Sequence, residues 1–129
     1  MSVETVSLWP TDFGERLDLL TPLLILRQQG AILGERTKNI VLGRVSTHSE
    51  GDSFVQRFSV HCPPLGYQIE LFSVKHGIEL YPATVVFPNE QGQNKEAADP
   101  DHLKTLLKDI FARPKTKQII ASLLAQSRQ

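Results

Sequence analysis

Apolar residues recur at helical spacing after a dipeptide that favours a helix start. Thr21 can accept a hydrogen bond from an unpaired backbone amide, and Pro22 loses no hydrogen bond at the first helical position. The residues that then share one helical face are Ile25, Leu26, Ile32 and Leu33. This pattern predicts a largely buried helix over 22–33, with Gly34 at its end. Gly30 lies inside it and costs about 1 kcal/mol relative to alanine, so we interpret it as a close approach to another backbone.

From residue 38 to residue 87 the pattern is typical of strands. Apolar and polar side chains alternate clearly over 54–62, which indicates a strand with one buried face. Turn sequences separate four predicted strands, which span 38–48, 54–62, 67–74 and 78–87. The connections are short, so we expect an antiparallel meander in the order 1-2-3-4. Pro82 cannot donate to a sheet ladder, so the fourth strand is predicted to be an edge strand or to be bulged there.

Two helices are predicted at the carboxyl end of the chain. Asp99 and Pro100 begin the first, whose apolar stripe ends at Phe111, and Arg113-Pro114 interrupts it. The second is predicted over 115–126. We expect an irregular N-terminal segment over 1–20 and a flexible polar loop over 88–98. The prediction is one α+β domain over 1–129, with an N-terminal helix, a four-stranded antiparallel meander sheet and two C-terminal helices.

The third and fourth predicted strands carry apolar residues on both faces. In strict alternation Ile69 and Phe72 point to opposite sides, whereas a sheet with one solvated face should be polar on that face. Two covers for the second face stay open: the chain's own helices, or a second copy or protein partner. The second alternative predicts a homodimer or partner interface formed by Trp9, Phe72, Val74, Tyr81, Val85 and Phe87.

Composition narrows the class of protein. The chain has 129 residues, with 14 Lys and Arg against 14 Asp and Glu, and one cysteine. An internal disulfide is therefore impossible, and we expect a cytoplasmic location. No apolar run approaches the ~20 residues that a membrane-spanning helix needs, and no secretory signal is evident. Zero formal net charge removes the general electrostatic argument for nucleic-acid binding.

Residues capable of catalysis or metal binding do not form a recognisable motif. His61 and Cys62 are consecutive on a predicted strand, so their side chains face opposite sides and are poorly placed to share a zinc ion. Cys62 is interpreted as a small buried apolar residue. We therefore predict no catalytic residue, no metal and no cofactor, and leave open whether the protein is an enzyme. The leading hypothesis is a bacterial-type accessory or protein-interaction domain that self-associates.

Two alternatives rest on charge and on polar residues. The stretch 104–117 holds five basic residues and one acidic residue, and it favours weak phosphate or nucleic-acid binding through Lys104, Lys108, Arg113, Lys115 and Lys117. Favourable lysines near a helix end explain the same pattern without any ligand. The other alternative is a small enzyme or ligand-binding pocket near the third and fourth strands, lined by Tyr67, Glu70, His76, Glu79 and Tyr81.

Overall fold

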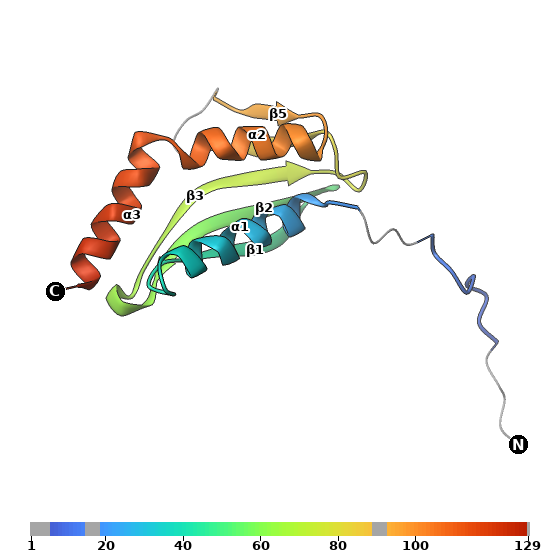
Figure 1. The fold of residues 1–129 in the computed structure, drawn as a ribbon. Helices are drawn as coiled ribbons and strands as arrows, with labels where there is room; N and C mark the ends of the chain where they lie inside the picture. Colours follow the sequence, from blue (N-terminus) through green and yellow to red (C-terminus); the bar gives the residue numbers. More distant parts are fainter. Residues whose placement is uncertain (1–5, 15–18, 89–92, 129) are drawn as a thin grey trace, which may run out of the picture.

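The structure is a computed structural model that describes residues 6–14, 19–88 and 93–128, and it shows an α+β fold (Figure 1). An N-terminal helix precedes a five-stranded antiparallel sheet, and two helices follow. The elements in chain order are α1 (Pro22–Arg36), β1 (Leu42–Glu50), β2 (Ser53–Cys62), the short 3-10 helix η1 (Pro63–Leu65), β3 (Tyr67–His76), β4 (Ala83–Val86), β5 (Lys95–Ala97), α2 (Pro100–Phe111) and α3 (Pro114–Ser127).

Two of the three predicted helix starts are confirmed by their capping hydrogen bonds, and the third helix begins at Pro114, one residue before the predicted start. The Thr21 hydroxyl accepts from the backbone amide of Leu24 at 3.1 Å, and the Asp99 carboxylate accepts from that of His102 at 2.8 Å. The predicted end of the first helix is wrong, because α1 continues past Gly34 to Arg36. A turn through positive φ angles at 38 and 39 then delays the first strand to residue 42.

The sheet order is β1-β2-β3-β4-β5, so the predicted meander of the first four strands is confirmed and a fifth strand is added. Strand β5 lies within the segment predicted to be a loop, of which residues 89–92 are outside the described part. Strand β4 is shorter than predicted. A turn in which the Leu80 amide donates to the Gly77 carbonyl at 3.0 Å occupies the start of the predicted strand, and Pro82 precedes β4 instead of lying inside it.

The main core lies between one face of the sheet and the helices. Buried side chains from α1 and α2, such as Ile25 and Leu107, pack in one cluster with Phe58, Phe72 and Val85 of the sheet. Helix α1 approaches β1 so closely that a Cβ built on Gly30 would lie 2.6 Å from the Gly43 carbonyl oxygen. The predicted backbone approach at Gly30 is therefore confirmed.

A β-bulge in β3 explains why strict alternation placed its apolar residues on both faces of the sheet. Phe58 pairs with Phe72, but the next residue of β2, Ser59, pairs with Glu70, so β3 contains one extra residue at Leu71. The extra residue reverses the alternation, and Ile69 and Phe72 both face the helices. The other face carries mainly polar side chains and needs no cover.

The prediction that a second copy covers the sheet is therefore wrong for its main residues. Phe72, Val74 and Val85 have no exposed surface, and Phe87 is 6% exposed, because the chain's own helices cover them. The fifth, Tyr81, packs at the edge of this core, and its hydroxyl donates to the Leu20 carbonyl at 2.8 Å. Trp9, the sixth residue of that set, is 75% exposed.

Candidate binding groove between the helices

A hollow separates α1 from the junction of α2 and α3. Helix α3 leaves the direction of α2 at Arg113-Pro114 (Figure 1) and packs on a different part of the sheet, where Leu123 contacts Val60 and Cys62. The hollow has a volume of about 570 Å³. Its lining residues are Gln29, Ile32, Leu33, Arg36, Phe58, Val60, Leu71, Lys108, Phe111, Thr116 and Ile120.

A second hollow of about 450 Å³ adjoins the first, because Gln29, Lys108 and Phe111 line both. Its other lining residues are Ile25, Lys104, Leu107, Ala112 and Lys117. We call the two hollows together the helical groove. It follows α1 from Ile25 to Arg36, a length of roughly 16 Å at the rise of an α-helix.

The walls and floor of the helical groove are largely apolar. Phe58 and Val60 of β2 contribute to the floor, and Ile32 of α1 is 39% exposed. Phe111 is fixed at the junction by two aromatic neighbours, with ring-centroid distances of 5.6 Å to Phe58 and 6.0 Å to Phe72. The groove therefore offers a rigid apolar surface to a ligand.

Positive charge surrounds this apolar surface. The four basic residues of the groove are Arg36, Lys104, Lys108 and Lys117, and the lining includes no Asp or Glu. Within the described residues, none of the four forms an ion pair with a carboxylate. An apolar surface bordered by unneutralised cations favours a ligand that is both apolar and anionic.

The structure divides the five basic residues predicted to bind phosphate. Lys104, Lys108 and Lys117 line the helical groove, whereas Arg113 and Lys115 line a different hollow of about 340 Å³. The Arg113 guanidinium lies there, 4.3 Å from the centroid of the Phe87 ring. Arg36 was missed by the sequence analysis, although its spacing of seven residues from Gln29 places both on one face of α1.

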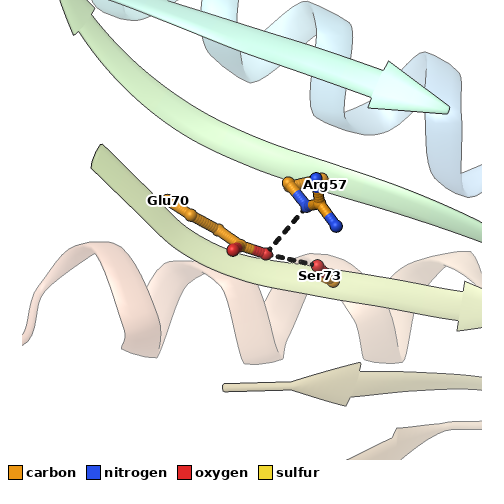
Figure 2. Close-up of polar contacts among 3 residues, drawn as sticks. All are labelled: Arg57, Glu70 and Ser73. Atoms are coloured by element: carbon orange, nitrogen blue, oxygen red, sulfur yellow. Dashed lines mark hydrogen bonds and ion pairs between the residues drawn. The ribbon is translucent and has the colours of Figure 1, made fainter. Parts of the chain in front are cut away.

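Two ion pairs neutralise four charged side chains on the open face of the sheet. Figure 2 shows two contacts of the Glu70 carboxylate. It forms an ion pair with Arg57 Nε at 3.2 Å and accepts a hydrogen bond from the Ser73 hydroxyl at 2.8 Å. A second pair, Lys75 Nζ to Glu50 Oε1, measures 3.4 Å. The helices lie behind the strands in this view, on the side away from the three side chains. This face is polar, and both of these carboxylates are paired there, which makes it a weaker candidate than the groove.

The five residues of the predicted strand pocket do not come together. Tyr67 and His76 occupy opposite ends of β3, and Glu70 lies on the open face. His76 is buried on the helix side, where its Nε2 lies 3.1 Å from Gln56 Nε2. Glu79 is exposed in the turn before β4. Burial, with a smaller contribution from Asp99, raises the pKa of Tyr81 to about 12.

The single cysteine behaves as a buried apolar residue. Cys62 has no exposed surface, packs with Val60 and Leu123, and has its Sγ 3.3 Å from the Ser127 hydroxyl. The described residues contain no cluster of three or more His, Cys, Asp or Glu side chains suited to a metal ion. All described helices are too short or too polar to span a bilayer.

Comparisons with protein-family models, with curated proteins and with solved structures found no match.

Proposed function

We propose that the protein is a non-catalytic, cytoplasmic protein-interaction module whose helical groove binds an acidic, apolar segment of a protein. The observation that carries the proposal is the combination in one groove of apolar walls from α1 and α3 with four basic residues and no acidic one.

The dimensions of the helical groove suit a peptide segment. Its length along α1 of roughly 16 Å matches about three turns of an amphipathic helix. Apolar side chains of such a segment would contact Ile32, Leu33 and Ile120, and its carboxylates would meet the lysines at the border. The charges contribute mainly to the choice of partner and to the association rate, and the apolar contacts supply most of the affinity.

A pair of model peptides tests this chemistry. One is an amphipathic helix with leucines at positions i, i+3, i+4 and i+7 and glutamates elsewhere, and its twin has lysines in place of the glutamates. In an NMR titration we expect the acidic peptide to shift backbone amides in the second half of α1 and around the α2–α3 junction. We expect no shifts on the open face around Arg57 and Glu70, and at least roughly tenfold weaker binding of the lysine twin.

Two lysines of the same helical turn provide a matched control. Lys117 lines the helical groove and Lys115 does not, although both are exposed near the start of α3. Lys117→Glu should weaken binding of the acidic peptide, and Lys115→Glu should leave it nearly unchanged. Equal effects of the two substitutions, or equal binding of the two peptides, would refute the proposal.

Phosphate or nucleic-acid binding remains the second hypothesis, and the same variants test it. Non-specific binding to a duplex depends on the number of cations that contact phosphates, so Lys115→Glu and Lys117→Glu should weaken it alike. Fluorescence anisotropy with a short DNA duplex at low salt measures this. Duplex binding without acidic-peptide binding would replace the interaction proposal with the nucleic-acid one.

A further inference from the structure

The chain itself contains an exposed apolar segment near its N-terminus. We call residues 6–14 the N-terminal arm. Its large apolar side chains are almost fully accessible: Val6 is 78% exposed, Leu8 96%, Trp9 75% and Phe13 66%. The Trp9 and Phe13 rings contact each other, with centroids 6.1 Å apart. Scattered single exposed apolar residues are common on proteins, but four within eight positions, two of them aromatic, are typical of a binding segment.

The charge of this part of the sequence complements the helical groove. Residues 1–20 contain four acidic residues, Glu4, Asp12, Glu15 and Asp18, and one basic residue, Arg16. Within the arm itself the one charged residue is Asp12, which lies between the two aromatic residues. Carboxylates among large apolar side chains are the chemistry that the groove favours, since its four cations have no carboxylate among the lining residues.

The chain is anchored to the body of the protein at Leu20, six residues after the arm. Leu20 packs against the main core, and its carbonyl accepts the hydrogen bond from the Tyr81 hydroxyl. Beyond this anchor the arm is drawn well away from the sheet and helices in Figure 1. The exposed side chains of the arm are therefore accessible to another molecule.

We propose that the N-terminal arm of one copy of the protein occupies the helical groove of a second copy and that the reciprocal contact closes a twofold homodimer. This inference rests on the proposed function, because it uses the same groove and names its occupant. Trp9 and Phe13 enter the apolar part of the groove as anchors, and Asp12 meets the lysines at its border. The interface then uses Trp9 and the helices, not the sheet face.

The arm carries its own reporter, because Trp9 is the single tryptophan of the chain. Insertion into an apolar groove shifts tryptophan emission to shorter wavelength and protects the ring from an aqueous quencher such as iodide. We expect this shift to appear as the protein concentration rises and to be lost on dilution. Sedimentation equilibrium should show conversion of monomer to dimer over the same concentration range.

Substitutions identify the two halves of the contact. Lys117→Glu should weaken the dimer by about tenfold or more and return Trp9 emission to that of an exposed indole, whereas Lys115→Glu should change neither. Trp9→Ser combined with Phe13→Ser should also give monomers. These positions are largely exposed, so the fold should be retained. Mixing the arm double variant with the Lys117→Glu variant should restore a heterodimer, because one arm and one groove remain intact.

Each other outcome overturns the inference. A blue-shifted Trp9 in a monomer at all concentrations would mean that the arm binds its own groove. A dimer that persists in the arm double variant would place the interface elsewhere. An exposed Trp9 in a protein that still binds the acidic model peptide would refute the arm as occupant and leave the proposed function standing, whereas loss of peptide binding as well would refute both.

Discussion

Gly30→Ala is expected to destabilise the protein, although alanine is the better helix former. A Cβ at Gly30 would lie 2.6 Å from the Gly43 carbonyl oxygen and 3.0 Å from its carbonyl carbon. Both neighbours are backbone atoms of β1, held by the register with β2, so neither can rotate away. Helix α1 must therefore retreat from the sheet.

The size of the effect follows from this geometry. Restoring ordinary contact requires a shift of roughly 0.4–0.8 Å, and a gap of this size forfeits about a quarter to a half of the dispersion energy of the atoms that separate. Ile25 and Leu26, both buried against the sheet, lose contacts in this way. We expect an overpacking cost of about 1–3 kcal/mol, offset by a gain of about 1 kcal/mol in helix propensity.

Gly34→Ala is the control that separates the backbone contact at Gly30 from the gain in helix propensity. It lies in the same helix and gains the same propensity, but its Cβ would meet side-chain atoms, Leu42 Cδ2 at 3.2 Å and Asn39 Oδ1 at 3.3 Å. We expect the free energy of unfolding, measured by urea denaturation, to be lower for Gly30→Ala than for Gly34→Ala by about 1–3 kcal/mol. Equal stability of the two variants would refute the argument.

Three further predictions concern polar groups that are buried or partly buried. The pKa of Tyr81 is raised to about 12, so folding favours the neutral phenol. This contribution to stability is complete below pH 10 and is lost as pH rises toward 12. Tyr81→Phe should therefore flatten that part of a plot of Tm against pH. Gln56→Leu removes the partner of buried His76 and should cost about 1–3 kcal/mol in urea denaturation. Thr116→Val should lower Tm and weaken acidic-peptide binding more than Thr105→Val does. Both hydroxyls donate to a carbonyl at 3.1 Å, but only the Thr116 hydroxyl is buried.

The fold was predictable where local chemistry decides it. The caps at Thr21 and Asp99 and the helix break at Arg113-Pro114 depend on neighbouring residues, and each is confirmed. The predicted strand at β2 is confirmed as well, although Val55 and Ser59 on its other face are also buried. The bulge at Leu71 depends on pairing between strands, so the alternation of β3 alone could not reveal it. Strand β5 is polar and three residues long, and only its position beside β4 makes it a strand.

The candidate site was predictable only in part, for a related reason. A run of basic residues pointed to Lys104, Lys108 and Lys117, but the run does not show which side of the α2–α3 junction each one occupies. Arg36 joins them from α1 and is separated by 68 positions from Lys104, a proximity that exists only after the helices pack on the sheet. From the sequence, Val60 and Leu71 are likewise expected to be ordinary core residues. Their place at the floor of the groove depends on the position of α3.

The bend between α2 and α3 is held by specific residues, which supports the groove beside it as a binding site. Proline at position 114 supplies no amide for the helical ladder, so α2 cannot continue and carbonyls at its end lose their partners. The Ile110 carbonyl accepts from the Arg113 amide at 3.2 Å and from the Thr116 hydroxyl at 3.1 Å, and Thr116 is 6% exposed. A bend whose polar groups are satisfied inside the protein holds one angle. A groove with a fixed angle loses little conformational entropy when a ligand binds, so modest apolar and charged contacts suffice for measurable affinity.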